Sequence, residues 1–364
     1  MWRALSLLPG RAGTRLPGDR RSIMRKHGIE EGRGAFVEGA WYIIADAACV
    51  GKRPVAVERF GTRLVLFRDE RGALVAARAR CPHRGADLGL GRVVDGAIEC
   101  PYHGFRFASD GRCVAIPCEG RGASARGAGD ALALTRYEAR EHRGFVWLFW
   151  GERPAELPPV PWFDGLPPDE RHAHTASVDW DVPFARAMEG MLDFHHLPFA
   201  HRPWFPGVGA MLDPCEVRVE GDVIRAEAVL RHDDGEPWDG RRGWRFEMEV
   251  RFPGVLRLSF GKRVVGMAGC APIDAERTAI VGRYYVPIPV IGRLLAWLGV
   301  RAEFWLIQPG DERMLASSEP RDADLDACRF VRADEGILAW HKMRRARLKA
   351  QRVGEPRRLP VEAG

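Results

Sequence analysis

The chain has 364 residues, which is enough for two domains with separate hydrophobic cores. Its composition, 46% hydrophobic and 29% charged, is that of a globular protein and excludes a disordered or fibrous chain. The formal net charge is +6, but the basic residues are scattered, so a solvated surface is the simplest interpretation and nucleic acid is not expected as a partner. Eight cysteines in a chain of this length do not indicate a secreted, disulfide-rich scaffold.

Residues 1–35 are predicted to be a basic leader that is either disordered or a misassigned start, with Met24 as the true beginning. The expected location is the cytoplasm, and an organelle transit segment is the alternative interpretation of this leader. The apolar run Ala4–Leu8 is too short to span a bilayer. Residues 285–307 are interrupted by prolines and charged residues, so no integral membrane span is expected there.

The predicted fold class is α+β, beginning with a small antiparallel β domain over residues 36–153. Short apolar or alternating runs between glycine-rich and charged turns indicate its strands. Proline-rich residues 154–168 are expected to form a linker. Strands of the first domain are expected at 41–44, 54–60, 62–67, 74–79, 93–99, 105–107, 114–116 and 144–150.

The second domain is predicted over residues 169–350, followed by a tail at 351–364. It should open with a helix from Phe184 to about His196 and then form long antiparallel strands. Those strands are expected within 216–230, 244–252, 255–260, 263–271 and 278–286, and the last helices at 291–305 and 325–350.

Two loops each pair a cysteine with a histidine, in Cys81-Pro-His83-Arg-Gly and Cys100-Pro-Tyr-His103-Gly. A Rieske 2Fe-2S cluster needs two thiolates on one iron and two imidazoles on the other, and each loop offers one of each. Zinc also accepts two cysteines and two histidines, but zinc fingers pair like ligands on each arm. The pattern therefore predicts that these four residues bind a 2Fe-2S cluster.

These loops closely resemble those of the Rieske domain family. Rieske proteins of respiratory complexes carry an extra cysteine on each loop, where this chain has Ala86 and Tyr102. The resemblance therefore implies the oxygenase-type branch, with one cluster per chain.

The second half contains a further ligand pattern, Asp193-x2-His196-x4-His201. On a helix, Asp193 and His196 would share one face, and Pro198 would then let His201 approach from another direction. His195 points elsewhere on such a helix and is assigned to packing or to an outer hydrogen bond. Two imidazoles need a carboxylate to complete a facial iron site, for which Asp311 is the candidate and Glu312 the fallback.

From about residue 36 to 345 the chain resembles the large (alpha) subunit of Rieske non-haem iron oxygenases, most closely the pheophorbide a oxygenase-like branch. The resemblance implies a helix-grip catalytic domain with one Fe2+ on His196, His201 and Asp311. It also implies a homotrimer, in which the catalytic residue Asp193 links His196 to a cluster histidine of the neighbouring subunit, His103 being favoured over His83. Many relatives have Asn where this chain has Gly190.

The predicted function is that of a terminal oxygenase inserting oxygen from O2 into an apolar or aromatic ring substrate, by monooxygenation, demethylation or ring oxidation. No Gly-x-Gly-x-x-Gly fingerprint is present, so a separate NAD(P)H-dependent reductase, perhaps with a ferredoxin, is expected as the partner. The alternatives are an electron-transfer protein and an iron-free ligand-binding relative. Candidate pocket-wall residues are Trp204, Phe205, Phe252, Phe260 and Met267.

Overall fold

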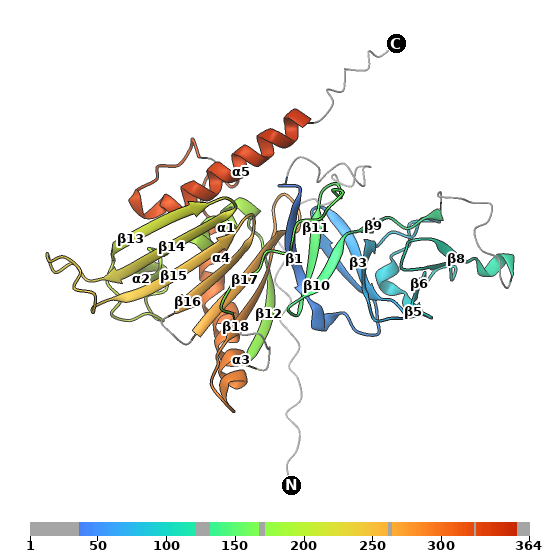
Figure 1. The fold of residues 1–364 in the computed structure, drawn as a ribbon, viewed down its shortest axis with the longest axis horizontal. Helices are drawn as coiled ribbons and strands as arrows, with labels where there is room; N and C mark the ends of the chain where they lie inside the picture. Colours follow the sequence, from blue (N-terminus) through green and yellow to red (C-terminus); the bar gives the residue numbers. More distant parts are fainter. Residues whose placement is uncertain (1–35, 121–131, 167–171, 261–263, 324, 355–364) are drawn as a thin grey trace, which may run out of the picture.

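The structure is a computed structural model that describes residues 36–120, 132–166, 172–260, 264–323 and 325–354. These segments form four antiparallel sheets and a set of helices (Figure 1). The expected leader and most of the expected tail lie outside the described residues, although the last helix continues to Gly354.

The first half of the chain is built from two sheets whose strands largely match the predicted runs. One has the order β1-β11-β10 and the other β2-β3-β4-β9. All six side chains of β11 are buried, as its continuous apolar run predicts. The bounds are β1 (Ala40–Asp46), β2 (Val55–Arg59), β3 (Thr62–Arg68), β4 (Leu74–Arg78), β9 (Arg136–Tyr137), β10 (Ala139–His142) and β11 (Phe145–Trp150), with a 3-10 turn η1 at Ala47–Cys49.

A third, smaller sheet lies at the far end of this half, in the order β5-β6-β7-β8 (Figure 1). Its core includes Phe67 from β3 as well as its own Ile98 and Phe107, so it packs directly against the preceding sheet. Its strands are β5 (Arg92–Val94), β6 (Ala97–Glu99), β7 (Arg106–Phe107) and β8 (Cys113–Ala115), flanked by the 3-10 turns η2 (Leu88–Leu90) and η3 (Pro117–Glu119).

The second half is dominated by a seven-stranded antiparallel sheet with the order β12-β18-β17-β16-β15-β14-β13. The run expected at 216–230 is two strands joined by a turn at Gly221 and Asp222. Strand β12 was not predicted, because its mostly polar sequence AHTASVDW lacks an apolar run. The bounds are β12 (Ala173–Trp180), β13 (Met211–Glu220), β14 (Val223–Arg231), β15 (Trp244–Arg251), β16 (Val255–Phe260), β17 (Val264–Pro272) and β18 (Thr278–Tyr285).

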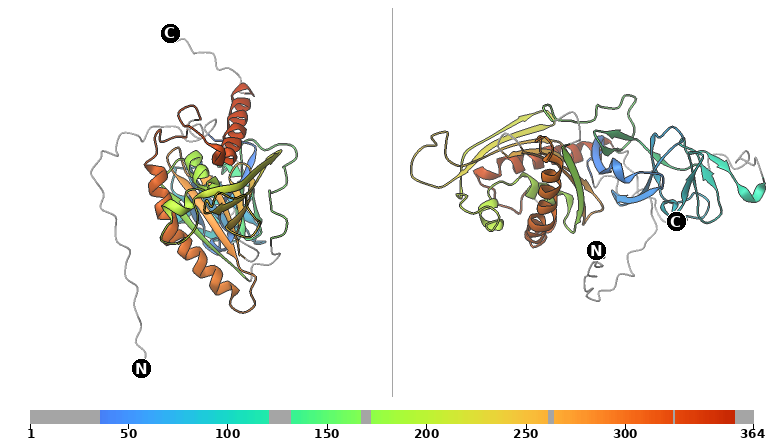
Figure 2. Two further views of the ribbon diagram at one scale, coloured as in Figure 1. Left: turned by 90° about the vertical axis from the view of Figure 1, so that its left-hand side faces the viewer. Right: turned by 90° about the horizontal axis from the view of Figure 1, so that it is seen from below.

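Helices lie against one face of this sheet, as the two further views in Figure 2 show. A long antiparallel sheet with helices on one face, preceded by the small β sheets, is the architecture that was predicted, and the fold class is confirmed. The helices are α1 (Phe184–Leu192), α2 (Leu197–Ala200), α3 (Gly292–Ala302), the π-helical turn η5 (Glu303–Ile307), α4 (Gln308–Ala316), the 3-10 turn η6 (Arg332–Asp334) and α5 (Glu335–Gly354).

Two predicted helix bounds were wrong. Helix α1 ends at Leu192 instead of continuing to His196, because Asp193 has extended backbone angles. The last helix begins at Glu335 and not near Leu325. The carboxylate of Asp334 accepts the backbone N–H of Val331 at 2.8 Å, which organises the turn that precedes the helix.

The two halves share one aromatic core. Phe60 stacks on Trp150 with ring centroids 4.2 Å apart, and Tyr42 reaches Phe184 of α1, which in turn contacts Trp340 of α5. Two backbone hydrogen bonds, from Phe60 to Pro272 and from Gly61 to Ile273, join the halves directly. These contacts fix the first three sheets relative to the second half of the chain.

The proline-rich segment between β11 and β12 contains no helix or strand in residues 151–166 but is packed against both halves. The indole N–H of Trp41 donates to the carbonyl of Pro158 at 2.9 Å, and Arg257 donates to the carbonyl of Asp164 at 3.1 Å. Phe163 is buried. The segment therefore acts as a fixed strap over its described residues and not as a flexible spacer.

The most apolar stretch of the second half becomes the end of β18, a proline loop and helix α3. This helix packs on the sheet through the small residues Gly292, Ala296 and Val300. Among the described segments, no helix combines the length and the apolar character needed to cross a bilayer.

A buried ion-pair network joins α1 to α5 and gives a stability prediction. Glu189 accepts from Arg186 at 2.5 Å and lies 2.6 Å from the ring nitrogen Nε2 of His341, with all three side chains at most 10% exposed. Glu189→Gln leaves Arg186 buried without its counter-charge, so we expect the free energy of unfolding to fall by about 3 kcal/mol in urea denaturation.

Glu216→Gln is the matched control for that prediction. Glu216 pairs with Arg218 at 2.8 Å, but both side chains are more than 60% exposed. Loss of such a pair should change stability by less than about 1 kcal/mol. Equal effects of the two substitutions would contradict the structural role given to the buried network.

Candidate metal centres

The two Cys-His loops have the same backbone construction. Cys81 follows β4 and donates its N–H to the carbonyl of Ala86 at 2.9 Å; Cys100 follows β6 and donates to Phe105 at 2.8 Å. Each loop thus closes across five residues, with the cysteine at its base and the histidine at its tip. The repeated Cys-Pro-x-x-Gly spacing produces two equivalent turns.

Gly85 and Gly104 end these turns in the left-handed region, with φ of +75° and +72°. Each donates its N–H to the carbonyl of the loop cysteine, at 2.8 and 3.0 Å. A Cβ on Gly85 would meet no atom within 4 Å, so backbone conformation and not space accounts for this glycine.

The four candidate cluster ligands lie together, with the thiols inside and the imidazoles outside. Cys81 and Cys100 are 3% and 2% exposed, and their side chains interact with each other. The rings of His83 and His103 are 4.8 Å apart between centroids, and His83 lies at the surface. Burial raises the pKa of the Cys81 thiol to about 11. The donor set fits a 2Fe-2S cluster with its imidazole-bound iron toward solvent.

A second cluster of donors forms where helix α1 ends. The carboxylate of Asp193 accepts the backbone N–H of His195 at 2.8 Å and that of His196 at 3.3 Å. This turn redirects the chain into the short helix α2, at whose two ends His196 and His201 lie. Asp193 and His196 are close because of this turn. The expectation that they share one face of a helix was wrong.

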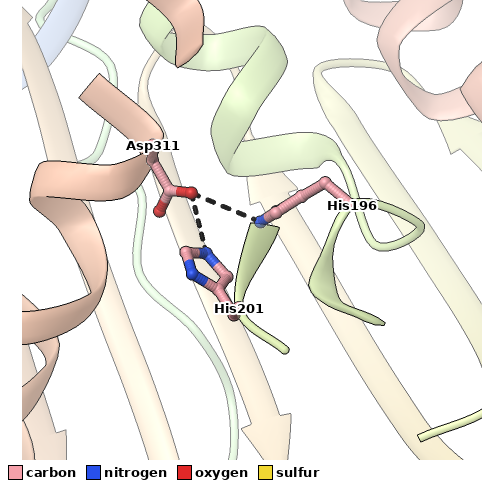
Figure 3. A group of neighbouring side chains, drawn as sticks. All are labelled: His196, His201 and Asp311. Carbon is pink, nitrogen blue, oxygen red and sulfur yellow. Dashed lines mark ion pairs between the residues drawn. The ribbon is translucent and has the colours of Figure 1, made fainter. Parts of the chain in front are cut away.

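Figure 3 shows that His196, His201 and Asp311 converge from α2 and α4. An oxygen of Asp311 lies 2.7 Å from Nε2 of His201 and 3.5 Å from Nε2 of His196. One donor atom from each residue lies within 4.8 Å of the others. His201 is 2% exposed, and its Nε2 makes no hydrogen bond of good geometry. A buried imidazole nitrogen aimed at another imidazole and a carboxylate fits a divalent metal.

The structure separates the two carboxylate candidates of α4. Asp311 lies in the first turn of α4 and faces the histidines. Glu312 turns away and accepts the backbone N–H of Asp181 at 2.9 Å. Gly190 of α1 faces Leu315 of α4, and a Cβ there would lie 2.6 Å from its Cδ1 atom, so a larger residue would force Leu315 to move. Gly190 therefore serves helix packing in this chain.

Asp193 lies between two imidazoles. Its oxygens are 2.9 Å from Nδ1 of His195 and 3.4 Å from Nδ1 of His196. Burial alone would raise the pKa of Asp193, but the hydrogen bonds and positive charge of His195 and His196 outweigh it and hold the pKa well below its usual range. An ionised Asp193 holds the ring of His196 so that its Nε2 faces Asp311. His195 takes the outer position that was predicted for it.

An apolar pocket adjoins the three converging donors. Phe205 and Met267 line it as expected, whereas Trp204 is 48% exposed, Phe252 belongs to the core and the side chain of Phe260 lies outside the described residues. Sequence reasoning missed two polar lining residues, Glu303 and Tyr284. The tyrosine hydroxyl donates to Glu303 at 3.3 Å. No motif marks them, and only the π-helical turn at Glu303, visible in the structure, singles the position out.

Comparison with known proteins gives a family match over the first half of the chain and a fold match over most of its length. Residues 40–137 match the Rieske [2Fe-2S] domain. Chlorophyllide a oxygenase, chloroplastic, of Chlamydomonas reinhardtii is 36% identical over 49% of this chain and 26% of its own length. The 3-chlorobenzoate-3,4-dioxygenase oxygenase subunit of Comamonas testosteroni is 33% identical over 42% of this chain and 34% of its own length. Protein TIC 55, chloroplastic, of Arabidopsis thaliana is 31% identical over 50% and 30%.

These matches span only about a quarter to a third of the relatives' own lengths. The fold extends further: dicamba monooxygenase bound to dicamba has a TM-score of 0.70 at 20% identity and covers 87% of this chain and 99% of its own. The chain therefore carries a Rieske [2Fe-2S] domain and is a relative of Rieske oxygenase alpha subunits. Chlorophyllide a oxygenase and TIC 55 belong to the pheophorbide a oxygenase-like branch, so the predicted resemblance is confirmed.

For the cluster, Cys81→Ser should remove the visible absorption of the purified protein, because a serine cannot replace the thiolate. Cys118→Ser is the control, since Cys118 is exposed and lies outside the two loops. Its spectrum should match that of the unchanged protein. An intact spectrum in the Cys81 variant would exclude Cys81 as a cluster ligand.

For the second centre, Asp311→Ala should weaken Fe2+ binding by more than the roughly 10- to 100-fold that loss of an outer hydrogen-bond partner costs. Fe2+ affinity is measured by titration of protein that retains the cluster. Glu312→Ala should bind Fe2+ normally, because Glu312 faces Asp181. Unchanged affinity in the Asp311 variant, with visible absorption preserved, would exclude that residue as a ligand.

Proposed function

We propose that the chain is the terminal oxygenase component of a multicomponent system, inserting oxygen from O2 into an apolar or aromatic ring compound. The observation that carries the proposal is the presence of two separate donor sets in one rigid chain. One combines two thiols with two imidazoles, and the other combines His196 and His201 with Asp311 beside an apolar pocket. An electron carrier would not need the second set.

The cluster, when bound, supplies electrons one at a time, and the ferrous ion supplies the position where dioxygen is activated. The residues of the chain provide the surroundings. Two imidazoles and one carboxylate leave open positions on the metal, Asp193 fixes the orientation of His196, and apolar walls exclude bulk water from the reacting edge of the substrate.

The placement of the two sites supports electron transfer between two subunits. The loops of the cluster belong to the β5–β8 end of the molecule, and α1, α2 and α4 belong to the other half (Figure 1). Asp193 remains 21% exposed, so a histidine of a neighbouring copy can reach it. His103, or alternatively His83, would donate to Asp193 across a head-to-tail homotrimer.

The pocket limits the size of the substrate. Its volume is about 120 Å³, close to the roughly 150 Å³ cavity known to hold one benzene ring. A single aromatic ring therefore fits without rearrangement, while a macrocycle would require the walls to move. Electrons would come from a separate NAD(P)H-dependent reductase, directly or through a ferredoxin. A cytoplasmic location is proposed, with an organelle as the alternative, which the names of two chloroplastic relatives favour.

Iron quantitation on anaerobically reconstituted protein tests the proposal. An oxygenase should contain about three irons per chain. An electron carrier, or a ligand-binding relative that lacks the mononuclear iron, should contain about two. Untargeted comparison of metabolites with active and Asp311→Ala protein should then reveal an oxygenated product. Two irons per chain and no O2-dependent product would overturn the proposal.

Asp193→Asn gives a prediction specific to the proposed bridge. Asn accepts through one oxygen only, so in protein saturated with Fe2+ we expect normal visible absorption but reoxidation of the reduced protein by O2 that is slower by about 10-fold or more. His195→Gln is the control, since its ring lies 2.9 Å from Oδ1 of Asp193, whereas the ring of His196 is near Oδ2, and His195 is not one of the three converging donors. Reoxidation as fast as in the unchanged protein would contradict the bridging role.

A further inference from the structure

The pocket beside His196 and His201 has largely apolar walls, and its polar lining away from the proposed metal ligands includes Tyr284, Glu303 and Gln308. Tyr284 of β18 lies across Gly266 of β17, where a Cβ would be 2.6 Å from the tyrosine ring. The glycine allows the ring to lie flat on the sheet, so that its hydroxyl reaches Glu303 in the π-helical turn. Sheet and helix thus bring two polar groups together inside an apolar cavity.

Both side chains are surrounded by protein yet keep accessible surface, and both line the pocket. Burial raises the pKa of Glu303, and the nearby negative charge of Asp311 raises it further. Burial likewise raises the pKa of Tyr284. A buried carboxyl and a phenol in an apolar cavity retain hydrogen-bonding capacity that an entirely apolar ligand would leave unsatisfied.

Among the described lining residues, no lysine or arginine side chain is directed into the pocket. Arg283 is the one arginine or lysine among the described lining residues, and its guanidinium points to the other side of the sheet. It donates to the hydroxyl of Thr175 and to the carbonyls of Arg143 and Gly144, and it lies 3.8 Å from the ring centroid of Phe145. The formal charges of Asp193 and Asp311 balance those of a bound ferrous ion.

We infer that Glu303 and Tyr284 form a polar subsite for a neutral or cationic hydrogen-bonding group, an alcohol or an amine, on an otherwise apolar ring, and that the pocket rejects carboxylates. This inference rests on the proposed function only in taking the pocket as the substrate site. Because Asp193 and Asp311 already balance a bound ferrous ion, a carboxylate beside the Glu303 carboxyl would add a buried negative charge that no lysine or arginine among the described lining residues faces. An alcohol or amine can donate to the Glu303 carboxyl.

Binding of single-ring probes tests the inference without any turnover. Isothermal titration calorimetry on the iron-loaded full chain would compare benzyl alcohol, benzylamine and benzoate. We expect benzoate to bind at least about tenfold more weakly than either of the others. Glu303→Leu should lower the affinity for benzyl alcohol about tenfold, and Tyr284→Phe should also lower it. Glu303→Gln keeps the hydrogen bond and should change this affinity by less than about threefold.

Glu312→Leu is the matched control, because this neighbouring acid faces Asp181 outside the pocket, and it should leave all three affinities unchanged. Three results would overturn the inference. These are benzoate binding as tightly as benzyl alcohol, no measurable binding of benzyl alcohol or benzylamine, and unchanged affinities in both Glu303→Leu and Tyr284→Phe. Probe binding as expected in a protein with only two irons per chain would contradict the proposed function and leave this subsite standing.

Discussion

The carboxylate of Asp193 is the constraint on which the rest of the second centre depends. It ends helix α1 by accepting two backbone N–H groups, and it holds the imidazoles on either side of it. If α1 continued as a helix through His196, the chain would not turn into α2, and His201 could not face Asp311. One side chain thus sets the path of the backbone and the direction of a metal-ligand ring. Its low pKa means that both tasks are performed by the charged form at neutral pH.

The shared aromatic core sets the position of the cluster loops relative to the second centre within one chain. Phe60, Trp150, Phe184 and Trp340 connect the cluster-bearing half to both α1 and α5, and the strap over residues 151–166 is pinned at Trp41 and Arg257. These contacts hold the cluster loops and His196 in separate halves of the chain. They support the proposal that the electron path runs to another copy.

The candidate ligands could be proposed from the sequence because each short loop carries its own thiol and imidazole, or two imidazoles, at a fixed spacing. This is how Cys81 with His83, and His196 with His201, were singled out. Asp311 was the sequence candidate with Glu312 as the fallback, and the fold separates the two, since Asp311 faces the histidines while Glu312 turns to Asp181. Strand β12 was missed because pairing with β18, and not its own apolar content, makes it a strand. The end of α1 was missed because local helical periodicity carries no information about a competing side-chain cap.

Glu303 and Tyr284 illustrate a different limit. Taken alone, a glutamate after a helix and a tyrosine at the end of a strand are ordinary residues, and their separation of 19 positions fits no motif. They become a pair because two glycines let aromatic rings lie against the sheet. Tyr284 lies over Gly266, and Phe304 lies over Gly282, which brings η5 close to β18. The same close approach leaves the polar pair beside the proposed metal ligands, in a space whose walls include leucine, methionine and phenylalanine side chains. In the proposed function, specificity therefore depends on the contact between a sheet and a helix, whereas most of the proposed metal ligands lie on short loops, so the two can vary independently.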